Sequence, residues 1–492
     1  MCGIFCALTK QKLTERAQRL RHRGPDNYHE YQDKSCFMGF SRLCIHDLSE
    51  HGNQPMQYKD MVLVCNGEIY NYKELIQKYN LKPQTDSDCE VILLLMDLCG
   101  DIYQVLSKLE GVFAFCLKVK DQFYVARDRF GVRPLFYAQN NEGYYFASEM
   151  KALHEIGPVQ WMPPGRVFNT TTQEFNPFFV CQAYNVTKPK EALTRAINKR
   201  LTGDRKVGFL LSGGLDSSIV SAVGNKTLGK IDTFSINYTH NSRDKPFSDL
   251  MAKHLDSNHH SVTYTFEEGI NILEEVIKMI ESYDITTVRA SVPHYLIGKY
   301  IKENTDIKIV LSGEGADEVC GGYLYLHKAP NQSLYREECS NLLDDIYRYD
   351  ALRSDRCLAS HGLEVRVPFL DPTFVNLYKR LDSDFQVKPE KTTLRQMFED
   401  ILPNQVCWRT KDGFSDSNGS FVKDLQAYID IIISDEELAD QPYFENPPLT
   451  KEALFYRRIF EKYYPDQGHL IPKMWLPKWV ETTDPSGELL MN

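Results

Sequence analysis

The sequence lacks the features that mark several specialised classes of protein. Its apolar runs, such as the one at 91–96, are far shorter than the roughly 18 residues of a membrane span. It has no CxxC pair, no internal repeat and no Walker-type phosphate motif, which argues against a zinc ribbon or a thioredoxin-like site. The first residues lack the basic region and long apolar run of a signal sequence. We therefore expect a soluble, cytoplasmic protein.

The chain has fewer basic than acidic residues. The chain has 57 Lys and Arg against 67 Asp and Glu, a net charge of −10, so nucleic acid or an anionic membrane is not expected as its main partner. A local phosphate site stays possible, because backbone N–H groups can form one. The 13 cysteines are scattered singly along the chain, a distribution typical of reduced thiols. The length of 492 residues predicts two or three domains.

Two patterns of secondary structure divide the chain. Up to about residue 180, apolar strands at 61–65, 111–117, 122–126 and 144–147 and helices at 13–21, 72–79 and 88–99 predict an α+β domain of antiparallel sheets. A Pro-, Thr- and Asn-rich stretch at 162–189 follows. Strands then alternate with helices, which predicts an α/β domain with a parallel sheet, and the chain is mainly helical beyond residue 335.

The segment Ser212-Gly-Gly-Leu-Asp-Ser-Ser218 follows an apolar strand and opens a helix. Ser212, Gly213 and Gly214 can direct successive N–H groups at a phosphate, and the helix N-terminus adds partial positive charge. The hydroxyl of Ser217 can donate another hydrogen bond. Asp216 would repel a phosphate unless a cation lies between them, which implies Mg²⁺. The alternative is a strand-to-helix turn with ordinary capping residues.

A second turn of this kind, Leu311-Ser-Gly-Glu-Gly-Ala-Asp-Glu318, carries three carboxylates. The carboxyl ends of parallel strands meet at one edge of a sheet, so the two turns can face each other across a nucleotide. Asp216 and Asp317 are then a candidate pair of Mg²⁺ ligands. An ordinary acidic cap is the alternative.

Cys2 differs chemically from the other cysteines. Removal of Met1 would leave an α-amine beside its thiol, with an unperturbed pKa of roughly 7.7–8.0, and this amine could act as the base for a thiol nucleophile. The dipeptide Cys2-Gly3 alone does not establish this role, because many proteins begin in this way.

Longer motifs carry a resemblance to a known family. Cys2-Gly-Ile4, Arg23-Gly-Pro-Asp26, Asn66-Gly-Glu-Ile-Tyr-Asn71 and Asp128-Arg-Phe-Gly131 make residues 2–180 similar to a class II glutamine amidotransferase, an N-terminal nucleophile hydrolase sandwich. The two strand-end turns, Asp284-Ile-Thr-Thr-Val-Arg-Ala290 and the segment from His361 to Asp371 make residues 190–480 resemble the doubly wound ATP-pyrophosphatase domain of glutamine-hydrolysing asparagine synthetases.

For the first domain, the resemblance implies that Cys2 attacks the side-chain amide of glutamine. Asn66 and Gly67 would form the oxyanion hole, a device worth a few kcal/mol in other acyl-transfer enzymes. The remaining glutamine-binding positions implied by the family are Arg42 for the α-carboxylate, Glu68 and Asp88 for the α-ammonium, and the backbone of Leu43 and Ile45. Arg42 could instead form a surface ion pair, and Asp88 could cap the following helix.

For the second domain, the resemblance implies a site for ATP and aspartate. Its implied positions are the backbone at Leu211, Ile236, Ser312 and Gly313 for adenine and ribose, Asp216 and Asp317 for Mg²⁺, Thr286 and Arg289 for aspartate, Glu314 for adenylate formation and ammonia, and Lys411 for the departing pyrophosphate. The implied substrates are L-aspartate, L-glutamine and ATP, with a dry passage for ammonia and a homodimer as family-level expectations.

Other functions stay open on the sequence alone. A relative could adenylate a different carboxylate, as β-lactam synthetases do, although those enzymes lack the working Cys2. A non-catalytic protein could keep the fold, although Cys2, Asn66, Asp216, Asp317, Glu314 and Lys411 are all present. A glutaminase alone would not account for the phosphate-binding turn.

Overall fold

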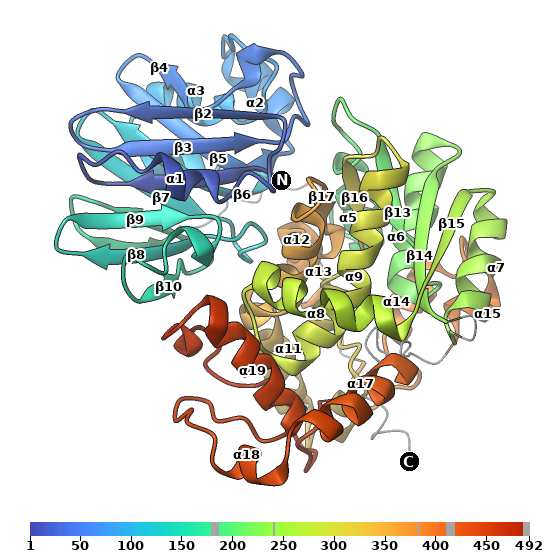
Figure 1. The fold of residues 1–492 in the computed structure, drawn as a ribbon. Coiled ribbons are helices and arrows are strands. Elements are labelled where there is room, and N and C mark those ends of the chain that lie inside the picture. The colour runs from blue at the N-terminus through green and yellow to red at the C-terminus, as the bar shows by residue number, and fades with distance from the viewer. Residues whose placement is uncertain (179–185, 240–241, 382–383, 410–418, 486–492) are drawn as a thin grey trace. The chain divides into compact units, whose positions relative to one another are not determined.

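The computed structural model describes residues 1–178, 186–239, 242–381, 384–409 and 419–485 (Figure 1). The chain forms two compact units. The first consists of Met1–Tyr184 with the short segments Thr202–Lys206 and Ala359–Glu364, and the second of Asn185–Leu201, Val207–Leu358 and Val365–Asn492. The domain limits 2–180 and 190–480 stay predictions, and the structure adds two later segments to the first unit.

The first unit contains two antiparallel six-stranded sheets, ordered β10-β8-β9-β1-β3-β2 and β12-β11-β7-β6-β5-β4. The strands are β1 Gly3–Ala7, β2 Asn27–Gln32, β3 Phe37–Arg42, β4 Met56–Tyr58, β5 Met61–Ile69, β6 Gly111–Val119, β7 Gln122–Arg127, β8 Phe136–Asn140, β9 Gly143–Ala147, β10 Val159–Trp161, β11 Arg166–Asn169 and β12 Glu174–Pro177. The helices are α1 Thr14–Gln18, α2 Tyr72–Tyr79, α3 Glu90–Cys99 and α4 Ile102–Leu106.

Strand β5 shows how the layers of this unit form. Its side chains alternate between the two faces of the sheet. Val62 and Val64 pack into the core between the sheets, whereas Leu63 and Cys65 pack against the cluster that includes residues of α3 and α4. Both faces are therefore apolar, as in a strand at the centre of a layered fold. The predicted nucleophile-hydrolase type of sandwich is confirmed.

The second unit contains a five-stranded sheet in the order β15-β14-β13-β16-β17. Its strands are β13 Val207–Leu210, β14 Asp232–Tyr238, β15 Asn258–Tyr264, β16 Ile309–Leu311 and β17 Glu364–Arg366. Strands β13, β14, β15 and β16 pair in parallel. The order reverses direction at β13, and ligands of doubly wound sheets bind at the carboxyl ends of strands beside such a reversal.

Helices make up most of the remaining second unit (Figure 1). They are α5 Pro189–Lys199, α6 Leu215–Leu228, α7 Lys245–Leu255, α8 Phe266–Ile280, α9 Ile285–Asn304, α10 Ala316–Cys320, α11 Gln332–Asp345, α12 Asp350–Ala359, α13 Pro372–Tyr378, α14 Thr392–Phe398, α15 Asn404–Cys407, α17 Gly419–Ile432, α18 Asp435–Ala439 and α19 Lys451–Tyr463. The predicted doubly wound α/β domain with a mainly helical end is confirmed. In the described part of the chain, no helix combines the length and apolarity needed to cross a membrane.

A buried charge cluster helps hold the second unit together. The carboxylate of Asp371 lies 2.6 Å from Lys199 Nζ and 3.2 Å from an Arg200 nitrogen, linking α5 to the start of α13. Burial alone would raise the pKa of Asp371, but the two cations outweigh burial and hold that pKa well below its usual range.

We expect Asp371→Asn to lower the free energy of unfolding by about 3–5 kcal/mol at pH 7, because it leaves buried cations without their counter-charge. The difference from wild type should shrink as the pH falls below about 4, where the wild-type carboxylate protonates on the way to its depressed pKa. Urea unfolding, monitored by hydrogen exchange in α13, measures the free energy of unfolding at each pH. Asp249→Asn, in the exposed Lys245–Asp249 pair, is the control and should change stability by less than about 0.5 kcal/mol.

Candidate active sites

Cys2 lies immediately before β1, and its thiol donates a weak hydrogen bond to the carbonyl of Leu43 over 3.7 Å. Arg23 Nε holds the Cys2 carbonyl at 2.9 Å. Met1 is buried, and its ammonium donates to the Leu363 carbonyl over 3.2 Å. With Met1 in place, burial raises the pKa of the Cys2 thiol to about 12 and lowers that of the Met1 amine to about 5. This form holds the thiol as a weak nucleophile.

Asn66 and Gly67 lie side by side in β5, with Asn66 almost fully buried. The Asn66 side-chain nitrogen Nδ2 is buried without a hydrogen-bond partner among the described residues. An unused buried donor costs stability, and oxyanion holes are built from such donors. A Cβ at position 67 would come within 2.7 Å of the Val112 carbonyl oxygen, so the close pairing of β5 with β6 requires glycine there.

Glu68 and Asp88 meet in the interior of the first unit, together with His46. His46 Nε2 lies 3.1 Å from Glu68 Oε2. Asp88 Oδ2 accepts the backbone N–H of Ile69 at 2.6 Å and makes no capping bond to α3. Burial and then the charge of Glu68 raise the pKa of Asp88 to about 7. The site therefore holds more negative charge than it can easily bury, which suits a cationic ligand.

Arg42 is buried and does not form the surface ion pair that the sequence left open. Its terminal nitrogens donate to the carbonyl of Ser49 at 2.7 Å, to Asn53 Oδ1 at 2.8 Å and to the carbonyls of His46 and Asp47. The guanidinium therefore fixes the loop that follows β3. Its predicted contact with a glutamine carboxylate stays a prediction.

The backbone of this loop is also held from a distant part of the chain. The Ile45 carbonyl accepts the N–H of Asp204 at 2.8 Å, and Arg205 Nε donates to the Cys44 carbonyl at 3.0 Å. These contacts explain why residues 202–206 belong to the first unit. Leu43 and Ile45 are buried in the same loop.

The second unit contains a cavity of about 710 Å³ at the carboxyl ends of β13 and β16. It brings together most of the predicted nucleotide-site residues from the two strand-end turns and from α9. Those that line it are Ser212, Gly214, Asp216, Ser217, Thr286, Ser312, Gly313, Glu314 and Asp317.

A glycine lets the first turn pack against α7, and another lets the second turn pack against the first. Gly213 has a φ of +76°, and an added Cβ would come within 2.4 Å of the Phe247 backbone. At Gly313, an added Cβ would come within 2.9 Å of the Asp216 Cβ and of the Ser217 backbone nitrogen. The Ser217 hydroxyl accepts the Ser212 N–H at 3.2 Å. The predicted meeting of the two turns at one sheet edge is confirmed.

Lys391 joins the two candidate metal ligands. Its Nζ lies 2.6 Å from Asp216 Oδ2 and 2.6 Å from Asp317 Oδ1, and its side chain is almost fully buried. Burial alone would lower the pKa of this lysine, but the two carboxylates outweigh burial and raise it. The other oxygen of Asp216 is buried with no hydrogen-bond partner in the described chain.

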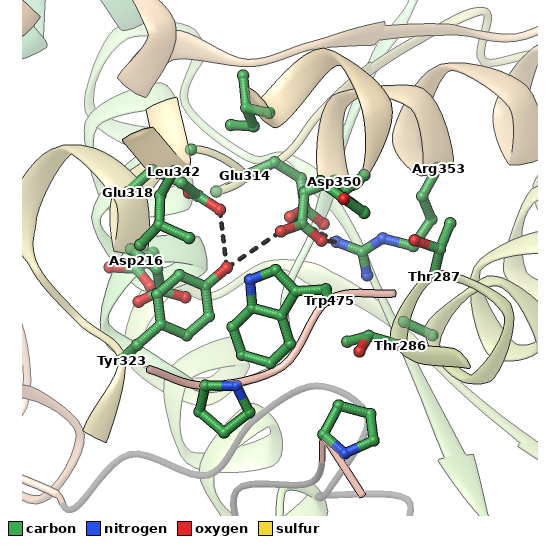
Figure 2. Close-up of a pocket in the computed structure, with 18 of the residues that line it drawn as sticks. Asp216, Thr286, Thr287, Glu314, Glu318, Tyr323, Leu342, Asp350, Arg353 and Trp475 are labelled. Atoms are coloured by element: carbon green, nitrogen blue, oxygen red, sulfur yellow. Dashed lines mark hydrogen bonds and ion pairs between the residues drawn. The ribbon is translucent and has the colours of Figure 1, made fainter. Parts of the chain in front are cut away.

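Glu314 belongs to a second group of charges, which Figure 2 shows around Tyr323 and Arg353. An Arg353 nitrogen lies 2.8 Å from Glu314 Oε2 and 2.6 Å from Asp350 Oδ1. The Tyr323 hydroxyl lies 2.7 Å from Glu318 Oε1 and 3.1 Å from Asp350 Oδ2. Burial raises the pKa of Glu314 to about 7, although Arg353 opposes this effect.

The two residues predicted to hold aspartate differ in their placement. Thr286 lines the cavity, and its hydroxyl is buried without a partner among the described residues. Arg289 does not line the cavity in the described chain. Its guanidinium forms paired contacts of 2.6–2.8 Å with Glu452 and 2.9–3.2 Å with Asp484. The structure therefore brings Thr286, but not Arg289, to the cavity, and the role of Arg289 stays a prediction.

Four other predicted positions either do not line the cavity or lie outside the described residues. Leu211, Gly213 and Ile236 do not contribute to the cavity lining in the described residues, although Leu211 and Gly213 adjoin residues that do. Lys411 lies outside the described residues.

Sequence reasoning missed four ionisable residues at the sites: His46, Lys391, Asp350 and Arg353. Lys391 carried the weakest signal, because it lies 74 positions beyond Asp317 in a turn with a φ of +56°. His46 could have been noticed as a titratable residue four positions after Arg42.

We expect Asp88→Asn to stabilise the first unit at pH 8 by on the order of 1–4 kcal/mol, because it removes a charge that the folded state disfavours. A raised carboxyl pKa destabilises the fold as the pH rises from about 4 through 7, so the advantage should vanish at pH 4. Hydrogen exchange in β5 at both pH values measures this. Asp86→Asn, two residues away and exposed, should show no such pH-dependent gain, and an equal gain would contradict the account.

Comparison with known proteins assigns a family to each part of the chain. Residues 1–201 match the family model described as a glutamine amidotransferase domain, and residues 188–340 and 330–483 match that described as asparagine synthase. The chain is 39% identical to a glutamine-hydrolysing asparagine synthetase of Gallus gallus and 38% identical to one of Homo sapiens, covering 100% of this chain and 98% of each relative. It is 38% identical to a probable asparagine synthetase of Acanthamoeba polyphaga mimivirus, with complete coverage of both chains. The chain belongs to the family of glutamine-hydrolysing asparagine synthetases.

Proposed function

We propose that this protein converts L-aspartate, L-glutamine and ATP into L-asparagine, L-glutamate, AMP and pyrophosphate. The observation that carries the proposal is the cavity of the second unit, in which the phosphate-binding turn, Asp317, Glu314 and Thr286 lie together. Neither a glutaminase alone nor a non-catalytic protein accounts for this combination.

In the first unit, the proposed nucleophile is the Cys2 thiol after Met1 is removed. The new α-amine then takes the thiol proton, and the sulfur attacks the amide carbon of glutamine. Asn66 Nδ2 can donate to the oxygen that becomes negative in this step. Ammonia leaves, and water releases glutamate from the thioester. Glu68 and Asp88 provide the negative charge that an α-ammonium requires.

In the second unit, the side-chain carboxylate of aspartate has to be activated, because a carboxylate is a poor electrophile. An oxygen of that carboxylate attacks the α-phosphorus of ATP, and the bond to pyrophosphate breaks. Ammonia then attacks the acyl carbon, AMP departs, and asparagine is formed. Glu314 can accept the proton that the attacking nitrogen loses, because its pKa of about 7 lies near the working pH.

The donor set of the same cavity fits Mg²⁺. Asp216 and Asp317 contribute carboxylate oxygens, which Mg²⁺ prefers in proteins, and one oxygen of Asp216 is buried without a hydrogen-bond partner in the described chain. The ion would neutralise charge on the phosphates. We further propose that Lys391, which lies between the same two carboxylates, and Lys411 bind phosphate oxygens. A homodimer and a cytoplasmic location are proposed with this function and rest on the family alone.

We expect purified protein supplied with aspartate, glutamine, ATP and Mg²⁺ to release AMP and asparagine in equal amounts. Cys2→Ala should abolish glutamine-dependent synthesis, because it removes the sulfur, while synthesis from added ammonia continues. Chromatography of the amino acids and nucleotides measures both. Cys99→Ala, a half-buried thiol at the end of α3, should leave both activities intact. AMP without asparagine would favour another carboxylate substrate, and loss of both activities in Cys2→Ala would contradict the two-site account.

Glu314→Gln should reduce synthesis from both glutamine and ammonia by about 10²–10⁴-fold, the usual contribution of a general base. Glutamine hydrolysis should continue, because it takes place in the first unit. Glu337→Gln, an exposed change on α11, serves as the matched control. Normal synthesis in Glu314→Gln would show that the proton leaves by another route.

A further inference from the structure

Three metal-binding types of side chain converge in the proposed glutamine pocket. His46 comes from the loop after β3, Glu68 from β5, and Asp88 from the segment before α3. All three are buried, and one ligand atom of each lies within 4.8 Å of those of the other two. His46 Nε2 and Glu68 Oε2 are already 3.1 Å apart, a separation compatible with two ligands of one ion.

The surrounding structure holds these side chains in place. Asp88 is anchored through Oδ2 to the Ile69 N–H at 2.6 Å. The His46 ring packs edge-on against Tyr72, with 5.6 Å between the ring centroids, and its carbonyl accepts a hydrogen bond from Arg42. Ligands held by their own neighbours need little further ordering when an ion arrives.

We propose that His46, Glu68 and Asp88 form a binding site for a divalent transition-metal ion, and that Zn²⁺ bound there excludes glutamine. One imidazole and two carboxylates are a donor set that Zn²⁺ accepts, with a fourth position for water. The imidazole disfavours Mg²⁺ and Ca²⁺, which prefer oxygen ligands alone.

The competition follows from charge, and it rests on the proposed function of this pocket. The α-ammonium of glutamine brings one positive charge to Glu68 and Asp88, whereas Zn²⁺ brings two to the same oxygens and also binds the imidazole. Both cations cannot occupy the site together. The second unit contributes none of the three ligands, so synthesis from free ammonia does not depend on them.

The first experiment measures free Zn²⁺, set with a metal buffer, as an inhibitor of the full-length protein. The apparent KM for glutamine should rise at least tenfold with Zn²⁺ while kcat stays constant, and ammonia-dependent synthesis should be unaffected. Both assays of synthesis contain ATP and Mg²⁺, so zinc bound to nucleotide would slow both. Equal inhibition of the two assays would overturn the proposal.

The second experiment detects the metal directly, with Co²⁺ as a probe in the full-length Cys2→Ala variant. The visible d–d absorption of bound Co²⁺ should appear although the Cys2 thiol is absent. Adding His46→Gln should remove it, whereas adding His51→Gln, an exposed histidine of the same loop, should not. A Co²⁺ signal that requires Cys2, or one that survives His46→Gln, would overturn the proposed ligands.

His46→Gln in the otherwise wild-type protein links the two experiments. Gln can still donate a hydrogen bond to Glu68, so the KM for glutamine measured without zinc should change by less than tenfold. The Zn²⁺ concentration needed to inhibit glutamine-dependent synthesis should rise at least tenfold. If that variant does not fold, Glu68→Gln provides the same test of Co²⁺ binding in the Cys2→Ala background. Because Co²⁺ binding is read without turnover, loss of the metal site and failure of the proposed activity give different results.

Discussion

Two ionised carboxylates that lie side by side repel each other unless a cation lies between them, and in the second unit Lys391 lies between the half-buried Asp216 and Asp317. Its contacts of 2.6 Å to Asp216 and to Asp317 join the turn after β13 to the turn after β16. Without a positive charge, the mutual repulsion and desolvation of the carboxylates would oppose the packing of these turns. The close approach of Gly313 to Asp216 depends on the same packing.

The first unit meets the same constraint in a different way. Glu68 and Asp88 are buried beside a histidine, and the pKa of Asp88 is raised to about 7. Part of the positive charge that these carboxylates need is left for the ligand to supply. A site of this kind gives up stability to gain affinity for a cation, which suits both the proposed α-ammonium of glutamine and the proposed metal ion.

Much of the architecture could be predicted because it depends on local patterns. The apolar run at 61–65 predicts a strand, and β5 includes it, with side chains packed on both faces of the sheet. The prediction that the two turns meet follows from the parallel sheet, since the carboxyl ends of β13 and β16 share one edge. Helix α7 begins at Lys245, and Pro246 in its first turn is a local signal for a helix start.

Contacts between distant segments could not be predicted in the same way. Arg289 matched a motif, yet its charge is satisfied by Glu452 and Asp484, which lie 163 and 195 positions away. Lys391 reaches Asp216 over 175 positions. The partner of a buried charge depends on tertiary packing, and neither residue type nor local spacing specifies it.

The central claim is that the second unit activates the side-chain carboxylate of aspartate by joining it to AMP. Aspartate labelled with ¹⁸O in that carboxylate tests this claim most directly, by mass spectrometry of the AMP formed during synthesis. The account predicts one ¹⁸O atom in the phosphoryl group of AMP for each asparagine made, because the carboxylate oxygen that attacks the α-phosphorus departs with AMP. AMP free of label, or label in pyrophosphate or inorganic phosphate, would contradict it.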